Sequence, residues 1–332
     1  MSLPERLGRL RRVDRLGVGG FATVWLYRDD DLASDVAVKA LADNWAQRLD
    51  IRERFLEEAR ILRRADSDHV VRVYDIGEEE GVPYFVMTYA DRGSLASVVE
   101  PGLPVPPGRV IDLVCQAGEG IGVLHAQGVV HRDIKPPNLL LRSDGDHEPR
   151  LLVADLGVAK AMLHASGLTQ VVGTPAYMAP EQANGLGVDS RADIHALAAV
   201  AYQLLTGRQV RSGGFGSLAE ATLPPAPSTL ADVPPALDHV ILRALEPDPS
   251  ARYTEVAEFV AALRHAVPAP SQGSFPPPSA HPRTRAGTPA PAPLGEGTRP
   301  SSPTTSLRLL ALLLLVLAVS FALSYAIASR VL

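Results

Sequence analysis

The chain has 332 residues, of which 46% are hydrophobic and 21% charged, so it is long enough for one large domain or two ordinary ones and too apolar to be disordered over most of its length. Its net charge of −5 provides no general basic field, and we expect no nucleic-acid partner. A single cysteine, Cys115, excludes an intramolecular disulfide framework and a cysteine-cluster zinc site.

Strand patterns fill the first third of the chain. The sequence predicts strands over residues 13–16, 23–27 and 36–40, and over two later apolar runs, 70–76 and 84–90, which a polar turn at 77–83 would connect. A helix is predicted between these two groups of strands, over roughly residues 51–63.

Two features of these strands are typical of phosphate binding. The turn at residues 16–24, LGVGGFATV, is rich in glycine, which lets backbone amides approach a phosphate with no Cβ in the way, although hairpins without ligands share this feature. It is not a Walker loop, because no Gly-Lys-Ser/Thr sequence follows. In residues 36–39, VAVK, strand alternation places Ala37 and Lys39 on one face, where a small residue beside a lysine suits a flat ring next to a phosphate. Lys39 is also one of only three lysines in the chain.

The predicted helix at 51–63 carries a carboxylate on its apolar face. Phe55 and Leu62 help to define that face, and Glu58 lies three residues after the first and four before the second, so it projects between them. A carboxylate on the packed side of a helix needs a cation, and Lys39 is a candidate. Glu57 is rotated by about 100° from Glu58 and is expected at the surface.

The chain up to residue 266 is otherwise predicted to be mostly helical. Helices are expected over residues 110–127, 193–206 and 254–266. Gly128 and Gly207 follow the first two of these and are predicted to end them, since glycine readily adopts the left-handed conformation of a helix stop.

The segment with the clearest chemistry is residues 131–138, HRDIKPPN. Asp133 and Asn138 are separated by a rigid Pro-Pro step, with Lys135 between them. Asp155 follows an apolar run at 151–154 and precedes Leu156 and a glycine, and an aspartate at a strand end is a good ligand for a hard cation. Two further motifs, GTP at 173–175 and APE at 179–181, come later in the chain.

The C-terminal part has a different composition. Residues 268–306 contain eleven prolines in 39 positions, and this run is predicted to be an extended linker. Residues 309–328, LLALLLLVLAVSFALSYAIA, contain no charge, and a helix of this length would span about 30 Å of hydrocarbon. Because Arg308 and Arg330 bracket it, the segment is predicted to be a transmembrane helix.

Taken in order, these motifs resemble those of Hanks-type protein kinases, and specifically bacterial Ser/Thr kinases with a cytoplasmic catalytic domain and one membrane span. The resemblance implies an α+β, two-lobed protein kinase fold with a small β-rich N-lobe and a larger α-helical C-lobe, followed by a C-terminal transmembrane helix. The implied domains are the kinase domain at 9–266, with lobes 9–90 and 91–266, a Pro-rich juxtamembrane linker at 267–306, and the membrane helix at 307–329.

The resemblance also implies roles for individual residues. Asp133 would orient the substrate hydroxyl and accept its proton, and Lys135 would neutralise the γ-phosphate. Asn138 and Asp155 would hold Mg²⁺ or Mn²⁺, and Lys39 would hold the α- and β-phosphates of ATP while pairing with Glu58. The residues expected around ATP are Leu16, Gly17, Val18, Gly19, Gly20, Phe21, Ala22, Thr23, Val24, Ala37, Lys39, Glu58, the gatekeeper Met87, and the hinge residues Thr88 and Ala90.

Further implied features concern activation and scaffold. The activation loop would contain Thr169, the preferred autophosphorylation site, and Thr174, with Ser166 as another candidate. Arg132 would anchor a phosphate on that loop. Asp193 would brace the backbone of the HRD segment, and Glu181 and Arg252 would form a buried ion pair. The chain departs from the usual family pattern at two positions. Ala22 stands where the family has the third glycine of the loop, and Leu156 stands where the family usually has phenylalanine.

The resulting expectation is an active ATP-dependent kinase that phosphorylates Ser/Thr hydroxyls of proteins and itself. The first alternative is a pseudokinase scaffold, which predicts the loss of Lys39, Asp133, Asn138 or Asp155, and all four are present. The second is a small-molecule phosphotransferase of the aminoglycoside-kinase type, a group that lacks the APE segment. We expect a single-pass protein of the cell membrane with a cytoplasmic kinase domain and no room for an extracellular sensor. A homodimer through Ala318, Ala322 and Ala326 is a further possibility.

Overall fold

The computed structural model describes residues 3–99, 102–157, 176–183, 187–211 and 222–267. All of them belong to one compact unit, residues 1–278, and the second unit, 279–332, lies outside the described part. Within these described ranges, no helix is both long and apolar enough to cross a bilayer. The span predicted at 307–329 lies outside them, as does the linker beyond residue 267.

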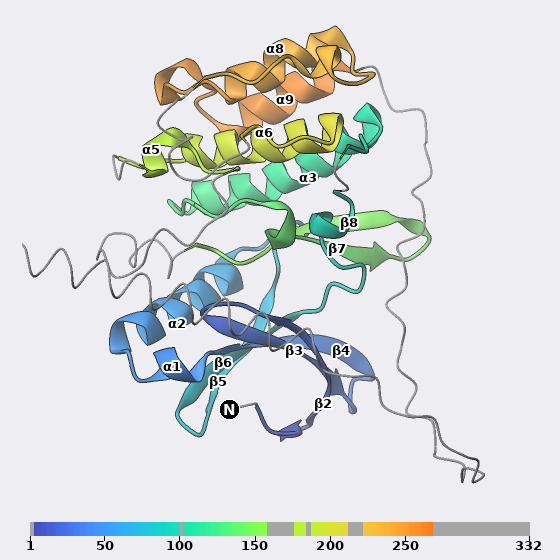
Figure 1. The fold of residues 1–332 in the computed structure, drawn as a ribbon. Helices are drawn as coiled ribbons and strands as arrows, with labels where there is room; N and C mark the ends of the chain where they lie inside the picture. Colours follow the sequence, from blue (N-terminus) through green and yellow to red (C-terminus); the bar gives the residue numbers. More distant parts are fainter. Residues whose placement is uncertain (1–2, 100–101, 158–175, 184–186, 212–221, 268–332) are drawn as a thin grey trace, which may run out of the picture. The chain divides into compact units, whose positions relative to one another are not determined.

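A six-stranded antiparallel sheet forms the N-terminal lobe (Figure 1). Its strands are β1 (Arg6–Leu7), β2 (Leu10–Val18), β3 (Ala22–Asp29), β4 (Ser34–Leu41), β5 (Val73–Glu79) and β6 (Val82–Thr88), in the order β1-β2-β3-β4-β6-β5. Two helices, α1 (Asp43–Ala46) and α2 (Leu49–Arg64), follow β4, and α2 packs against β5 and β6. The helix predicted at 51–63 and the three first strands are therefore confirmed.

Strand β4 shows why the sheet can be covered on both faces. Ala37 belongs to the main hydrophobic core, whereas Val36 and Val38 belong to a second, smaller core with Tyr27 and the N-terminal Leu7. This is the alternation predicted from the VAVK pattern. The N-terminal segment is part of the lobe, because β1, which precedes the predicted domain start at residue 9, pairs with β2.

The hairpin between β5 and β6 differs from the prediction. The turn is only Glu80–Gly81, with φ of 49° and 82°, rather than the whole of 77–83. Strand β5 begins at Val73 rather than at residue 70, and it continues through polar Glu78 and Glu79. The physical reason is that β5 is an edge strand of the sheet, so its polar residues remain in solvent while its backbone pairs with β6.

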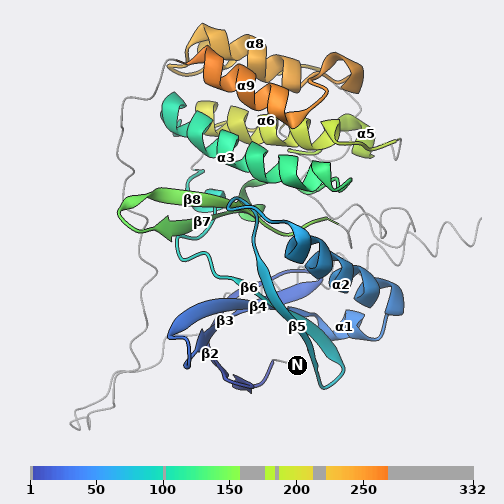
Figure 2. The ribbon, with the colours of Figure 1, turned by 180° about the vertical axis from the view of Figure 1, so that it is seen from behind.

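The C-terminal lobe is built on long helices, stacked as Figure 2 shows. These are α3 (Pro107–Ala126), α6 (Arg191–Thr206), α8 (Pro235–Ala244) and α9 (Val256–Ala266), with the short α5 (Pro180–Ala183). A two-stranded hairpin, β7 (Leu139–Asp144) and β8 (His147–Val153), lies between this stack and the N-terminal sheet. Short 3-10 turns are η1 (Leu95–Ser97), η2 (Pro136–Asn138), η3 (Pro227–Thr229) and η4 (Pro249–Ala251).

The helix ends confirm two predicted stops. Gly128 and Gly207 follow α3 and α6 with φ of 74° and 67°. At Gly207 a Cβ would also come within 2.8 Å of the backbone of Gly102 and Leu103, so a side chain is excluded by space as well as by conformation. Helix α8 was not predicted, although its buried residues Leu237, Val240, Ile241 and Ala244 follow the helical period and proline stands at its first position.

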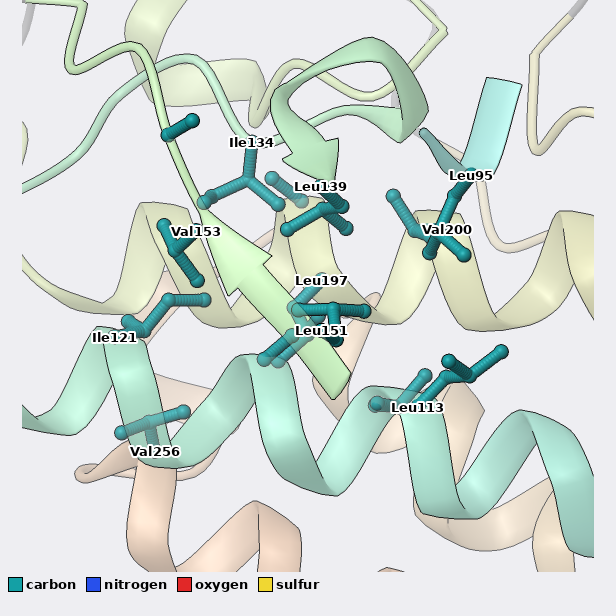
Figure 3. Packing of buried hydrophobic residues seen from close by; sticks show 14 of the residues in the cluster. Leu95, Leu113, Ile121, Ile134, Leu139, Leu151, Val153, Leu197, Val200 and Val256 are labelled. Carbon is teal, nitrogen blue, oxygen red and sulfur yellow. The ribbon is translucent and has the colours of Figure 1, made fainter. Parts of the chain in front are cut away.

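One continuous core connects the hairpin to the helices. Leu151 and Val153 of β8 lie against Ile121 of α3 and Leu197 of α6, as Figure 3 shows. Each of these four side chains is fully buried. This packing holds β7 and β8 in place, and the candidate site residues adjoin them: Asn138 immediately precedes β7, and Asp155 lies two residues after β8.

Candidate active site

A buried lysine connects the two lobes. The Nζ atom of Lys39 on β4 donates to Oε1 of Glu58 on α2 at 2.7 Å and to Oδ1 of Asp155 at 2.7 Å. Burial alone lowers the pKa of Lys39, but the charges of Asp155 and Glu58 more than reverse this effect and raise it. Lys39 is therefore a fixed cation at neutral pH.

The segment after Arg132 presents a second carboxylate. Asp133 contacts Lys135, whose Nζ lies 3.1 Å from Oδ1 and 3.0 Å from Oδ2. Asn138 donates from Nδ2 to Oδ2 of Asp133 at 2.9 Å and to its backbone carbonyl at 2.7 Å. The Asp133 carboxylate is thus oriented by two side chains of its own loop.

Asp193 on α6 holds the backbone of this loop. Its side chain is buried and accepts from the amide of His131 at 2.7 Å and from the amide of Arg132 at 2.8 Å. The ring of His125, at the end of α3, lies 2.9 Å from the same carboxylate. The contact between Asp193 and the loop has the form that the resemblance implied, whereas His125 was not predicted. A histidine in the last turn of a helix is too common to single out.

His131 fixes the loop from the other side. Its Nδ1 accepts from the amide of Asp133 at 3.3 Å, so Nε2 carries the proton and donates to the carbonyl of Ala154 at 3.0 Å. Burial lowers the pKa of His131, and the neighbouring carboxylates of Asp193 and Asp133 only partly offset this effect. The ring therefore stays neutral and keeps this donor pattern at neutral pH.

Two residues of the site have left-handed backbone conformations. Arg132 has φ of 65° and Asp155 has φ of 58°. A non-glycine residue in this region costs about 1–3 kcal/mol and persists only where its surroundings enforce it. Two hydrogen bonds enforce these conformations. The amide of Arg132 donates to the Asp193 carboxylate, and the amide of Gly157 donates to the His131 carbonyl at 2.9 Å.

Asn138 and Asp155 are suited to hold a divalent cation. The amide of Ala154 donates to the carbonyl of Asn138 at 3.0 Å, which keeps the two segments adjacent. Because Nδ2 of Asn138 is engaged by Asp133, the amide presents its oxygen as the metal-binding end. Carboxylate and amide oxygens are the donors that Mg²⁺ prefers, so these residues fit the metal. The carboxylates of Glu58, Asp133 and Asp155 outnumber the ammonium groups of the two lysines, which also favours a cation.

The glycine-rich turn is the tip of the β2–β3 ribbon. Gly17 pairs with Val24, and Val18 pairs with Thr23. Neither backbone angle nor packing within the described structure requires its glycines: none of them has positive φ, and a Cβ on Gly17 or Gly20 would meet no atom within 4 Å. The space beside these two glycines is therefore open, as the expected approach of a phosphate to their backbone would need. Leu16 is exposed, whereas Ala22 is buried.

The predicted hinge begins at Thr88, the last residue of β6. Met87 is buried and pairs with Ala37 across the sheet, which places the gatekeeper candidate beside the small residue of the VAVK strand. The amide of Thr88 donates to the carbonyl of Arg72 at 2.9 Å. This amide is therefore not available for the adenine contact expected of the hinge.

A buried ion pair lies in the C-terminal lobe. Arg252 donates to both carboxylate oxygens of Glu181, at 2.7 and 2.8 Å, and its side chain is fully buried. The neighbouring Gln182, which was not predicted, accepts from the amide of Ala179 at 3.1 Å and donates to the carbonyl of Arg132 at 3.0 Å. Gln182 therefore connects the APE segment to the catalytic loop. The expected activation-loop residues Ser166, Thr169 and Thr174 lie outside the described residues.

The departure at Leu156 is accommodated by packing. Its side chain is buried in the main core. The following Gly157 has a stricter requirement, because a Cβ there would lie 3.0 Å from the His131 carbonyl and 3.1 Å from Cβ of Asp133. Glycine at this position lets the segment after Asp155 approach the loop at residues 131–133 closely.

Two buried histidines predict a loss of stability in mild acid. Burial lowers the pKa of both His131 and His195, and the charges of Arg252 and Arg211 lower that of His195 further. In the unfolded chain both rings titrate near pH 6.5, so below that pH the unfolded state binds protons that the folded state does not. The free energy of unfolding is therefore expected to be unaffected above about pH 6.5 and to fall below it, by up to about 1.4 kcal/mol per pH unit for each histidine.

Urea unfolding of the whole chain at several values between about pH 7 and pH 5 measures this dependence. The His195→Gln variant, which lacks one of the two titrating rings, should lose less stability over the same interval. A wild-type free energy of unfolding that stays constant across it would contradict the prediction.

Comparison with known proteins identifies the class. The model of the family described as "Protein kinase domain" matches residues 10–266. The chain therefore belongs to the protein kinase family, and its two-lobed arrangement of a β-sheet lobe and a helical lobe is the kinase fold.

Similar proteins narrow this class to bacterial Ser/Thr kinases. The chain is 38% identical to serine/threonine-protein kinase Pkn1 of Myxococcus xanthus over 270 residues, which are 79% of this chain and 39% of Pkn1. It is 34% identical to PknJ of Mycobacterium tuberculosis over 88% of this chain and 50% of that relative. The crystal structure of the M. tuberculosis PknI kinase domain superposes with a TM-score of 0.62 at 28% identity, over 79% of this chain and 98% of the other. The chain thus spans half or less of the length of these curated relatives.

Proposed function

We propose that this chain is an ATP-dependent serine/threonine protein kinase of bacterial signal transduction that also phosphorylates itself. One observation carries the proposal: a continuous set of hydrogen bonds connects Asp133 to Lys39. The Asp133 carboxylate contacts Lys135 and Asn138. A backbone hydrogen bond from Ala154 to Asn138 keeps the adjacent Asp155 beside this loop, and Asp155 accepts a hydrogen bond from Lys39. We therefore assign Asp133 as the general base, Asn138 and Asp155 as the source of metal-binding oxygens, and Lys39 as the phosphate-binding cation, on the strength of these hydrogen bonds.

Each group has a definite task in phosphoryl transfer. Lys39, held by Glu58, would bind the phosphates of ATP and keep them fixed relative to the N-terminal sheet. Asn138 and Asp155 would hold a divalent cation, which would neutralise phosphate charge. Asp133 would orient the Ser/Thr hydroxyl and take its proton from Oγ. Lys135 would place a positive charge beside the transferring group, where the charge is spread over its equatorial oxygens.

Transfer of label from [γ-³²P]ATP tests this proposal. The full chain with Mg²⁺ is expected to label itself and a generic protein substrate, with the label recovered as phosphoserine or phosphothreonine. Replacing Lys39 by methionine should lower the labelling rate by at least about 100-fold, because the phosphates lose their buried cation in a water-poor site.

The matched control is Arg28→Met. Arg28 lies one strand away on β3, where it forms an exposed ion pair with Asp35 at 3.0 Å. The Arg28→Met substitution removes a cation from the same sheet without altering the site, and this variant should become labelled at the wild-type rate. A wild-type chain that binds ATP but labels nothing would instead favour the pseudokinase scaffold.

We also propose that residues 307–329 anchor the chain in the cell membrane, with the kinase domain cytoplasmic and residues 267–306 as an extended tether. The support is compositional: the uncharged stretch at 309–328 is as long as a bilayer is thick, and ATP is an intracellular substrate. The full chain should remain with membranes after alkaline extraction, whereas a 1–306 form should be released.

A homodimer formed through the same helix is tested by crosslinking. The full chain in membranes should crosslink to a dimer more than the 1–306 form does. Equal crosslinking of the full chain and the 1–306 form would contradict a role for the helix in dimerisation.

A further inference from the structure

The tip of the glycine-rich turn is bound to a tryptophan outside the strands. The indole Nε1 of Trp45 donates to the carbonyl of Gly20 at 2.8 Å, and its ring lies 5.2 Å from that of Phe21, inclined by 33°. A third contact comes from the same segment, where the amide of Ala42 donates to the carbonyl of Phe21 at 2.8 Å. Two consecutive carbonyls at the tip are thus held by residues 42–45.

This attachment also fixes where the amides at the tip point. The carbonyl and the following amide of a trans peptide point in opposite directions. With the Gly20 carbonyl bonded to the indole, the amide of Phe21 is directed away from α1. Amides on that side of the tip are the donors expected to meet a phosphate.

The tryptophan belongs to the segment that leads into α2. It lies in the one-turn helix α1, and its carbonyl accepts from the amide of Arg48, the N-cap residue of α2, at 2.9 Å. Helix α2 carries Glu58, which accepts a hydrogen bond from Lys39. The position of α2 and the position of the loop tip are therefore linked through one side chain.

The tip of the turn consists largely of residues with high backbone freedom. Gly17, Gly19 and Gly20 give this ribbon more backbone freedom than any other residue type would, and Val18, between them, is exposed. The Trp45 side chain is partly buried and packs against the main core without being one of its buried members. Its donor and its ring are both spent on the turn.

We propose that Trp45 is a positioning residue that holds the glycine-rich loop in place for ATP and ties that placement to helix α2. This inference rests on the proposed kinase function. It assigns to Trp45 a role in nucleotide affinity rather than in the chemical step, because the indole contacts the loop and none of Asp133, Asn138 or Asp155 in the described structure.

Kinetics of two substitutions test the role. Trp45→Phe keeps a ring for Phe21 but removes the donor to Gly20, and we expect the KM for ATP to rise about 3- to 10-fold; Trp45→Ala removes both contacts, and we expect about 10- to 30-fold. In both variants kcat should change less than about 3-fold, the pattern of lost binding rather than lost transition-state stabilisation. The melting temperature of each variant shows that it is folded.

The matched control is Trp25→Phe, the only other tryptophan of the chain. Its ring lies on β3 under the guanidinium groups of Arg12 and Arg15, at 5.0 and 5.9 Å, on the same sheet. It should leave the KM for ATP unchanged. The same variant makes Trp45 the sole indole, so a change in its fluorescence on adding Mg-ATP reports directly on the loop.

The link to α2 is tested by combining Trp45→Ala with Glu58→Gln. If both act on one coupled unit, the rise in KM for the double variant will be smaller than the product of the single effects. Multiplicative effects would overturn the coupling, and a Trp45→Ala KM within about 2-fold of wild type would overturn the positioning role. A wild type that neither binds ATP nor transfers phosphate would overturn the proposed function itself, so the two failures are distinguishable.

Discussion

Replacing Asp133 by asparagine is expected to lower kcat for phosphoryl transfer by about 10²- to 10⁴-fold, the range typical of losing a positioned general base. Asparagine keeps the size of the side chain and can still contact Asn138, but it has no basic oxygen for the hydroxyl proton and no charge for Lys135. ATP binding should be nearly unchanged, because Lys39, Glu58 and the glycine-rich turn are intact. Initial rates with [γ-³²P]ATP, together with ATP affinity measured by calorimetry, separate the two effects.

The control for this substitution is Asp35→Asn. Asp35 is an exposed carboxylate on β4 that pairs with Arg28 and lies on the far end of the strand from Lys39. Its removal should alter neither rate nor affinity. An Asp133→Asn chain that retains more than about a tenth of the wild-type kcat would rule out the assigned role of Asp133.

The second large effect is expected at Asp193, where replacement by alanine should lower the free energy of unfolding by about 2–5 kcal/mol and abolish transfer. Its buried carboxylate accepts from two backbone amides and is bonded to His125. Removing it leaves the buried amide of His131 and the partly buried amide of Arg132 without their acceptor. It also removes the contact that holds Arg132 at φ of 65°, so the loop should relax and Asp133 should lose its position. Urea unfolding measures the first effect and initial rates the second.

Asp248→Ala serves as the comparison for Asp193. Asp248 also accepts from a backbone amide, that of Ser250 at 2.8 Å, but at the surface, at the start of η4. Water can replace the lost acceptor there, so stability and rate should change far less. If the Asp193 and Asp248 variants were equally stable, the bracing role of Asp193 would be wrong.

Local patterns predicted the elements on which the site is built. Period-two alternation placed Ala37 and Lys39 on one face of β4, and the 3.6-residue period placed Glu58 on the buried face of α2. Left-handed glycines ended α3 and α6 where expected. Each of these features depends on residues within about one or two turns of each other, which is why sequence periodicity predicts them.

Two predictions were incomplete for different reasons. Strand β5 runs through polar residues because it is an edge strand, and the residue pattern alone does not say which strand will lie at an edge. Its neighbours in space, rather than its local sequence, decided that outcome. Helix α8 was missed although the signal is local: its buried residues Leu237, Val240, Ile241 and Ala244 follow the helical period, and proline stands at its first position.

Residue patterns were enough to identify the class of this protein, the order of its motifs and the residue types available for phosphoryl transfer. They did not show how these residues meet in the fold. Lys39 contacts Asp155 across 116 positions, Asp193 accepts from two amides more than 60 positions away, and Gln182 and Trp45 each hydrogen-bond to a loop that their local sequence does not indicate. The physical reason is that such contacts depend on how sheet, hairpin and helices pack around a common core, whereas residue patterns report only the local backbone and its buried face.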